Sequence, residues 1–359
     1  MTTVRVNLGP RAYDIEVGSG LLNRSAEFFQ LRHPGRHAVL ICDANVSRLY
    51  GQPLADTLTA AGYRCNLLEV PAGEASKNIA QADRLWNELL ACQTDRKSIV
   101  IAVGGGVVGD LAGFVAATFT RGLAFFQIPT TLLAQVDSSV GGKVGINLPA
   151  AKNMIGAFWQ PSGVLIDLAA LTSLPKREYL SGLAEVVKYG VILDAPFFEY
   201  LESVVPQLLA RDAAVLERVV ARCCELKAQV VEQDEREETG LRAVLNYGHT
   251  FCHAIEAVSG YGAFLHGEAV AIGMIQASQL AERLGRIDTA VTIRQRVLLQ
   301  KLELPVTISG LEPQQLLAAM QHDKKVEHGK LRFVLPTQLG HVELVAGVSP
   351  DRVLEVLRG

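Results

Sequence analysis

Metal-binding side chains recur in apolar stretches of this sequence. His249 and His253 are spaced i and i+4, which places both on one face of a helix, and His266 stands where the next helical pattern begins. Glu185 precedes Lys188 by three residues on an otherwise apolar helix. A lone helical histidine is usually a core or surface residue. However, a buried charge must be paired or coordinated, and two imidazoles with a carboxylate form an ordinary catalytic site for zinc or a similar divalent ion.

The H-x-x-x-H spacing also occurs in zinc proteases, which need a glutamate directly after the first histidine. Here that position is Thr250, so the protease interpretation fails. Asn246 lies one turn before His249 and Arg242 one turn earlier still, and we expect all three on one helix.

A glycine-rich turn follows an apolar strand at Ser98–Val103. Gly104, Gly106 and Gly109 match G-x-G-x-x-G, where the backbone can approach a pyrophosphate at a helix N-terminus. The acidic residue expected about twenty positions later is missing. Asp43 instead ends an earlier apolar run, where a carboxylate could bind ribose hydroxyls. A turn without a ligand, and an Asx turn at Asp43, are the structural alternatives.

Polar residues follow further apolar strands, with Glu74 and Lys77 after one and Thr130 and Thr131 after another. Taken together, these positions favour a dinucleotide site. Cations also interrupt apolar surroundings, which favours a pocket for a multiply anionic ligand over a solvated face. These cations are Arg121, Lys143, Lys152, Lys188, Lys227, Arg242, Lys324 and Lys325.

The pattern of apolar residues divides the chain near residue 173. Before it, short apolar runs alternate with helical stretches, which predicts an α/β domain with a mainly parallel, Rossmann-like sheet over residues 1–173. An alternating pair around Gly9-Pro10 predicts an N-terminal hairpin. After it, helix follows helix, with one late hairpin around Gly340, so residues 174–359 should form a mainly α-helical domain.

Composition excludes several classes of protein. The 359 residues carry 34 Lys and Arg against 37 Asp and Glu, a net charge of −3 that is too balanced for a nucleic-acid binder or a polybasic membrane binder. The six cysteines show no framework spacing, which favours reduced thiols. The N-terminus lacks an apolar signal core, and no apolar run is long enough to cross a bilayer. We therefore expect a soluble cytoplasmic protein.

Several sequence blocks together closely resemble the dehydroquinate synthase family of sugar-phosphate cyclases, over nearly the whole chain. The blocks are Gly104–Asp110, Pro129–Lys143, Ala184–Gly190 and Asn246–Thr250. The resemblance implies an NAD-binding N-terminal domain, a metal- and substrate-binding C-terminal domain, an active site in the cleft between them, and a homodimer. Cys252 departs from the family, which usually has glycine there.

The resemblance also assigns residues by position. It implies a zinc or cobalt ion bound by Glu185, His249 and His266. It implies NAD contacts from Asp43, Asn45, Glu74, Lys77, Gly105, Gly106, Val107, Val108, Gly109, Asp110, Thr130, Thr131, Lys143, Lys152, Thr172 and Ser173. Catalytic residues would be Asp137, Lys143, Lys188, Lys227, Asn246 and His253, and substrate contacts would come from Arg121, Asn153, Arg242, Lys324 and Lys325.

The implied reaction converts 3-deoxy-D-arabino-heptulosonate 7-phosphate to 3-dehydroquinate and phosphate, a step of the shikimate pathway towards chorismate. It combines transient oxidation by NAD, β-elimination of phosphate, re-reduction, ring opening and aldol closure. Three alternatives stay open: another sugar-phosphate cyclase, an NAD- and metal-dependent polyol dehydrogenase of related fold, and a nucleotide-binding module without activity.

Overall fold

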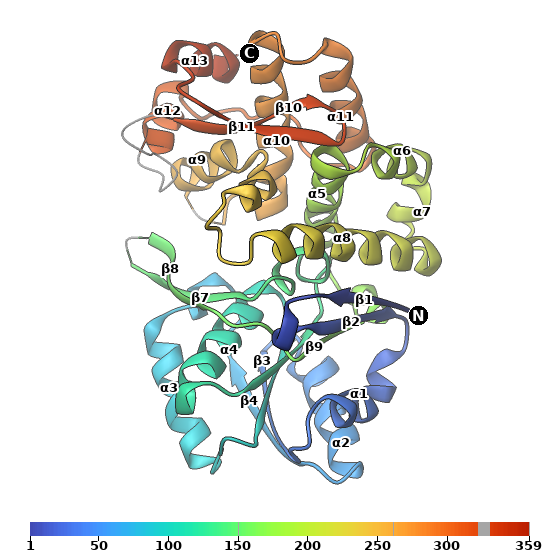
Figure 1. The fold of residues 1–359 in the computed structure, drawn as a ribbon. Helices are drawn as coiled ribbons and strands as arrows, with labels where there is room; N and C mark the ends of the chain where they lie inside the picture. The colour runs from blue at the N-terminus through green and yellow to red at the C-terminus, as the bar shows by residue number, and fades with distance from the viewer. Residues whose placement is uncertain (150, 261, 322–330, 359) are drawn as a thin grey trace. The chain divides into compact units, whose positions relative to one another are not determined.

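A computed structural model describes residues 1–149, 151–260, 262–321 and 331–358 (Figure 1). The chain forms two compact units. The first comprises Met1–Leu174 together with Leu216–Glu232, and the second comprises Pro175–Val215 together with Gln233–Gly359. Residues 216–232, expected in the C-terminal domain with the rest of 174–359, pack with the first unit. That the active site lies in a cleft between two domains stays a prediction.

The first unit is built on a seven-stranded sheet in the order β1-β2-β9-β6-β5-β3-β4. Its strands are β1 Thr2–Val6, β2 Tyr13–Gly18, β3 His37–Asp43, β4 Arg64–Val70, β5 Ile99–Gly104, β6 Ala124–Pro129 and β9 Gly163–Asp167. The pair β1 and β2 is the predicted antiparallel hairpin, and the other neighbours pair in parallel. The prediction of a mainly parallel sheet is therefore confirmed. All six residues of β5 are buried, because helices cover both faces.

Two apolar cores lie on opposite faces of this sheet. One includes Leu85 and Leu111, and the other includes Phe29 and Leu58. The α-helices that contribute to them are α1 Ser25–Arg32, α2 Gln52–Ala60, α3 Ile79–Ala91 and α4 Gly106–Thr118. A further helix, α8 Ala213–Gln233, contains the later segment Leu216–Glu232 that belongs to this unit. The short helices are η1 Gly9–Arg11, η2 Leu21–Arg24, η3 Ser47–Gly51, η4 Glu74–Ser76, η5 Phe119–Arg121, η6 Ala134–Ser138 and η7 Leu168–Thr172.

A separate hairpin in the first unit was missed by the sequence analysis. It comprises β7 Lys143–Leu148 and β8 Ala151–Phe158, which pair antiparallel. Glycines 145 and 156 face each other in this pair, and a Cβ on Gly145 would lie 2.6 Å from the carbonyl oxygen of Ile155. Glycine has no side chain to contribute to the alternating apolar pattern that predicts a strand. The sequence of this segment therefore shows only short polar stretches between apolar residues.

The second unit is mainly helical, as predicted. Its helices are α5 Lys176–Leu193, α6 Ala195–Ser203, α7 Val205–Leu209, η8 Leu241–Asn246, α9 His249–Ser259, α10 His266–Arg283, α11 Thr289–Lys301, α12 Pro313–Gln321 and α13 Pro350–Arg358. The predicted late hairpin is present as β10 Arg332–Gln338 and β11 His341–Ala346. Helices α5 and α10 are buried along most of their length, which explains their nearly continuous apolar sequences.

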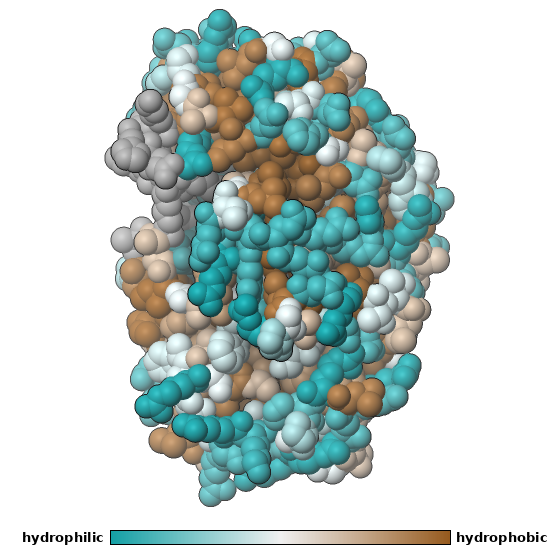
Figure 2. Space-filling model, viewed as in Figure 1, coloured by the Kyte–Doolittle hydropathy of each residue, from teal (hydrophilic) through white to brown (hydrophobic). Residues whose placement is uncertain are grey.

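The face of the molecule in Figure 2 is covered largely by hydrophilic side chains, with hydrophobic ones exposed in smaller patches. Across the part of the chain that the structure describes, every helix is too short or too polar to cross a membrane.

Asp167 ends β9 and joins two segments of the first unit. Its side chain is buried and accepts hydrogen bonds from the backbone amides of Gly20 at 2.9 Å, Leu22 at 3.0 Å and Ala169 at 2.9 Å. The carboxylate therefore satisfies three amides that would otherwise lack partners at the ends of η2 and η7.

We expect Asp167→Ala to lower the free energy of unfolding of the first unit by about 3 kcal/mol, because the substitution leaves buried amides unsatisfied. Urea unfolding followed by far-UV circular dichroism measures this. The control is Asp83→Ala on the exposed face of α3, which should change it by less than about 0.5 kcal/mol. Equal unfolding midpoints for the two variants would contradict the role given to Asp167.

Candidate active site

The nucleotide candidates of the first unit lie along the carboxyl edge of its parallel strands. From β3 the chain moves to β4 on one side and then crosses back to β5 on the other side of β3. The strand order thus reverses between β3 and β5, and ligands of open α/β sheets bind at such a point. Asp43 is the last residue of β3, and the glycine-rich turn follows β5. The structure brings these two predicted segments together.

Close packing explains the glycines of this turn. A Cβ on Gly105 would lie 3.1 Å from Thr131 Cγ2, one on Gly106 would lie 3.0 Å from Ser138 Oγ, and one on Gly109 would lie 2.8 Å from Gln127 Oε1. Val107 and Val108 stand in the first turn of α4, with Val108 buried beneath Gly104. The buried Thr130 Oγ1 has no hydrogen-bond partner among the described residues, so a hydroxyl remains there for a ligand.

Asp43 forms an Asx turn, the structural alternative considered from the sequence. Its Oδ1 accepts hydrogen bonds from the amides of the exposed Asn45 at 2.9 Å and of Val46 at 3.3 Å. Burial raises the pKa of this carboxyl. The Ser173 hydroxyl lies 2.6 Å from Tyr50 Oη of η3, and Thr172 Oγ1 donates to Ala169 O at 2.7 Å.

Lys77 joins residues that the resemblance assigned to different ligands. Its buried ammonium donates to Asp110 Oδ2 and to Asn153 Oδ1, although the first was assigned to NAD and the second to substrate. Burial raises the pKa of Asp110, and the adjacent Lys77 opposes that shift. Glu74 Oε1 accepts a hydrogen bond from Asn147 Nδ2 at 2.7 Å, which ties η4 to the same hairpin.

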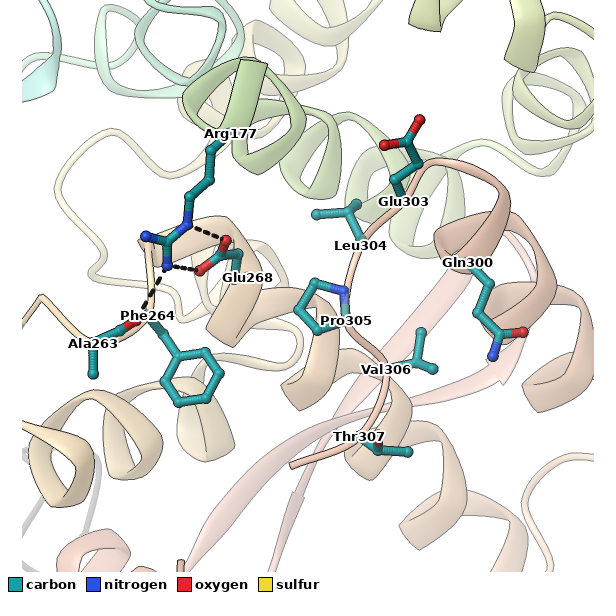
Figure 3. Close-up of a pocket in the computed structure, with 10 residues that line it drawn as sticks. All are labelled: Arg177, Ala263, Phe264, Glu268, Gln300, Glu303, Leu304, Pro305, Val306 and Thr307. Carbon is teal, nitrogen blue, oxygen red and sulfur yellow. Dashed lines mark hydrogen bonds and ion pairs between the residues drawn. The ribbon is translucent and has the colours of Figure 1, made fainter. Parts of the chain in front are cut away.

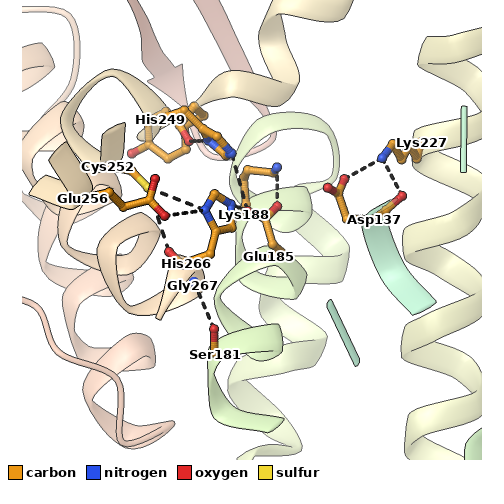
Figure 4. A network of polar contacts seen from close by, with 11 residues as sticks. Asp137, Ser181, Glu185, Lys188, Lys227, His249, Cys252, Glu256, His266 and Gly267 are labelled. Atoms are coloured by element: carbon orange, nitrogen blue, oxygen red, sulfur yellow. Dashed lines mark hydrogen bonds and ion pairs between the residues drawn. The ribbon is translucent and has the colours of Figure 1, made fainter. Parts of the chain in front are cut away.

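The other predicted site cations of the first unit lie on α8, on the β7–β8 hairpin and on η5. Lys227 of α8 is buried and donates to Asp137 O at 2.6 Å and Asp137 Oδ1 at 2.7 Å, so two predicted catalytic residues meet (Figure 4). Lys143 and Lys152 lie on the β7–β8 hairpin. Arg121 ends η5 in the left-handed region, with φ +70°, which costs a non-glycine residue free energy.

In the second unit, Glu185 of α5, His249 of α9 and His266 of α10 converge (Figure 4). Nε2 of each imidazole lies 3.7 Å from Glu185 Oε1, and the two rings have centroids 5.4 Å apart. A tetrahedral ion with bonds of about 2.1 Å separates its ligand atoms by roughly 3.4 Å. A small contraction of this cluster would therefore complete a three-ligand site.

The Glu185 carboxylate is fully buried. Lys188, one turn along α5, forms an ion pair with Oε2, whereas Oε1 accepts no hydrogen bond from the described residues. A buried carboxylate in this state loses much of its solvation and keeps lone pairs for a further cation. The donor set and the unsatisfied Oε1 of Glu185 thus fit a divalent metal ion.

Glycines set the approach of the three helices that carry this cluster. Gly267 N donates to Ser181 Oγ at 3.0 Å, and a Cβ on Gly267 would lie 1.8 Å from the Ser181 carbonyl oxygen. A Cβ on Gly273 would lie 2.3 Å from the carbonyl oxygen of Gly248. The first contact holds the start of α10 against α5, and the second holds α10 against the start of α9.

The N-terminus of α10 is fixed further by Glu268, beside a surface pocket (Figure 3). Its carboxylate accepts hydrogen bonds from Leu265 N at 2.8 Å and from Arg177 Nε and Nη2 at 2.7 and 2.8 Å. This places His266 at the first position of its helix, as the sequence predicted.

Hydrogen-bonding groups behind each imidazole orient Nε2 towards Glu185. His249 Nδ1 lies 3.1 Å from Tyr247 O, and His266 Nδ1 lies 3.4 Å from Glu256 Oε1. Burial lowers the pKa of His266, but nearby Cys252, Glu185 and Glu256 outweigh it and raise the pKa well above its usual value. Glu256 was missed, although its position seven residues after His249 on the same helix was a usable signal.

One prediction about this region is wrong. Arg242 and Asn246 do not share a helix with His249, because they lie on η8, which ends before Gly248 with its φ of +78°. Arg242 is buried, and its Nη1 donates to Glu235 O at 2.8 Å. His253 does lie on α9, with its ring centroid 5.7 Å from that of His249. Lys324 and Lys325 fall outside the described residues.

Two family models match the chain, 3-dehydroquinate synthase N-terminal over residues 67–181 and 3-dehydroquinate synthase C-terminal over residues 182–326. A 3-dehydroquinate synthase of Desulforamulus reducens is 51% identical over 358 residues, covering 99% of each protein. A 2-deoxy-scyllo-inosose synthase structure with carbaglucose-6-phosphate, NAD+ and Co2+ is similar at a TM-score of 0.91, with 27% identity and 99% coverage of each chain. A 2-epi-5-epi-valiolone synthase from Streptomyces hygroscopicus, with NAD+ and Zn2+, gives a TM-score of 0.88, with 28% identity and 96% coverage of each.

We expect Gly267→Ala to disturb the second unit strongly, because its Cβ would overlap the Ser181 carbonyl oxygen and separate α10 from α5. Thermal unfolding should show a loss of about 3 kcal/mol, within the range for overpacked cores. Ser181→Ala is the matched control, since it removes the hydrogen bond without adding an atom and should cost about 1 kcal/mol. If Gly267→Ala is as stable as the wild type, the close approach does not constrain the cluster.

Proposed function

This chain belongs to the 3-dehydroquinate synthase family, and we propose that it converts 3-deoxy-D-arabino-heptulosonate 7-phosphate to 3-dehydroquinate and phosphate. The observation that carries this proposal is the fully buried Glu185 carboxylate, with two imidazole Nε2 atoms each 3.7 Å from its Oε1. The lyase reaction loses phosphate from a seven-carbon acid, so the protein must bind two anionic groups and move protons between carbon and oxygen.

NAD and one divalent ion are the cofactors that we propose, zinc or cobalt being the candidates for the metal. Glu185, His249 and His266 would hold the ion, while the carboxyl edge around Asp43 and the turn at residues 104–110 would hold NAD. When bound, NAD takes up and returns a hydride, and the ion polarises an oxygen ligand. Thr130 Oγ1, which is buried and unsatisfied among the described residues, supports a polar ligand at this edge.

The chain's own cations would bind the anions of the substrate. The ammonium of Lys227 is fixed by two acceptors on Asp137, so it presents a charge at little further entropic cost. Lys188 is buried beside Glu185, which puts a fixed cation next to the proposed metal ligand. Two such ammonium groups suit a phosphate dianion and a carboxylate. Arg121, Lys143, Asn153 and Arg242 stay predicted substrate contacts.

Proton transfer would fall to His253 and Asn246. The His253 ring lies beside the His249 ring on α9, within one helical turn of a proposed metal ligand. An imidazole at this place could accept a proton from the substrate or return one to it. We further propose a homodimer in a reducing, cytoplasmic setting; the six free cysteines support the reducing environment.

We expect His249→Ala to lower zinc affinity by at least about a hundredfold, because it removes one of three ligands, whereas His253→Ala should keep about one zinc per chain. Elemental analysis after dialysis against a weak chelator measures this. Both variants should lose turnover, the first for lack of metal and the second for lack of a proton carrier. Equal zinc retention in the two variants would contradict the assignment of the ligands.

We expect the pure, metal-loaded protein to release phosphate from the heptulosonate phosphate for many turnovers per NAD, with no growth of NADH absorbance. The reason is that the hydride taken up early in the reaction returns to the same substrate. The assay records phosphate and NADH together, with NAD far below substrate. Accumulation of NADH in step with consumed substrate would instead support the polyol dehydrogenase alternative.

A further inference from the structure

A second group of metal-binding side chains lies directly behind His266. Among the described residues, Cys252, Glu256 and His266 each offer a ligand atom within 4.8 Å of the others. His266 Nδ1 lies 3.9 Å from Cys252 Sγ and 3.4 Å from Glu256 Oε1 (Figure 4). Cys252 and Glu256 are i and i+4 on α9, so the helix itself sets their spacing.

These separations match a tetrahedral ion. Bonds of about 2.3 Å to sulfur and about 2.1 Å to nitrogen and oxygen place the nitrogen roughly 3.6 Å from the sulfur and roughly 3.4 Å from the oxygen. The two separations from His266 Nδ1 thus lie within about 0.3 Å of the values for such an ion. A sulfur, nitrogen and carboxylate set favours a thiophilic divalent ion, such as cadmium or excess zinc, over magnesium or calcium.

We propose that Cys252, Glu256 and Nδ1 of His266 form a second, thiophilic metal site that competes with the proposed catalytic site for His266. The formation of this site does not depend on the proposed function, whereas the competition does. Binding forms a metal–sulfur bond and a metal–nitrogen bond, and it releases the thiol proton of Cys252 and the proton on Nδ1 of His266 to solvent, with no change in oxidation state.

The competition follows from the chemistry of imidazole. A neutral ring has one nitrogen that carries hydrogen and one with a free lone pair, so it donates to one ion at a time. His266 Nε2 faces Glu185 Oε1 at 3.7 Å, while Nδ1 faces Cys252 and Glu256. An ion behind the ring would therefore take His266 from the front site and leave Glu185 and His249 as the only ligands of that group.

Cadmium titration of metal-free protein tests the second site directly, through the ultraviolet charge-transfer band of a cadmium–thiolate bond. The wild type should show the band with one bound thiolate per chain. Cys252→Ala and Cys252→Ser should lack it, while all variants keep the other five cysteines. Glu256→Gln and His266→Ala should weaken cadmium binding by at least about tenfold.

His249→Ala separates this proposal from the proposed function. It removes a ligand of the front site but none of the second, so its cadmium–thiolate band should equal that of the wild type. In wild-type protein loaded with one zinc, added cadmium should also displace that zinc, and in Cys252→Ala it should do so at least about tenfold less readily.

Three results would overturn the proposal. The first is a wild-type protein without a thiolate band, and the second is a band that persists in both cysteine variants. The third is a band in Glu256→Gln and His266→Ala that saturates at the wild-type cadmium concentration. None of these results bears on phosphate release from the heptulosonate phosphate, which tests the proposed function separately.

Discussion

The buried charge of Glu185 is the constraint on which the second unit depends. A carboxylate with no exposed surface is costly to bury, and its ion pair with Lys188 offsets part of that cost. Two imidazoles aimed at the same oxygen indicate that the fold keeps this carboxylate for a further cation. This requirement explains why α5, α9 and α10 pack closely together, because each helix supplies one of the three ligands.

Glycines are the means by which the sequence reaches this geometry. At Gly267 and Gly273 a single added carbon would meet a backbone carbonyl oxygen of another helix, and at Gly248 the positive φ ends η8 and lets α9 begin with His249. In the first unit the same residue type serves another purpose. There, the glycines after β5 lack side chains that would collide with neighbouring residues at the point where the strand order reverses.

Much of this could be predicted from local pattern. The parallel strands, the helical second unit and the start of α10 at His266 all follow from apolar periodicity, which reports burial. The β7–β8 hairpin could not be found this way, because glycines replace the side chains that signal a strand. The break between η8 and α9, just before His249, was missed. The polar residues keep a helical spacing in the sequence there, but the backbone does not stay in one continuous helix. The meeting of Lys227 with Asp137 needs the tertiary path of α8, which no local pattern encodes.

The central claim is that Glu185, His249 and His266 bind the metal ion that the chemistry requires. X-ray absorption spectroscopy of protein loaded with one equivalent of zinc tests it most directly, because it reports the ligand atoms themselves. We expect nitrogen and oxygen scatterers at about 2.0–2.1 Å, with the outer-shell pattern of two imidazoles and no sulfur. A sulfur scatterer at about 2.3 Å in that one-equivalent sample, or a spectrum with fewer than two imidazoles, would contradict it.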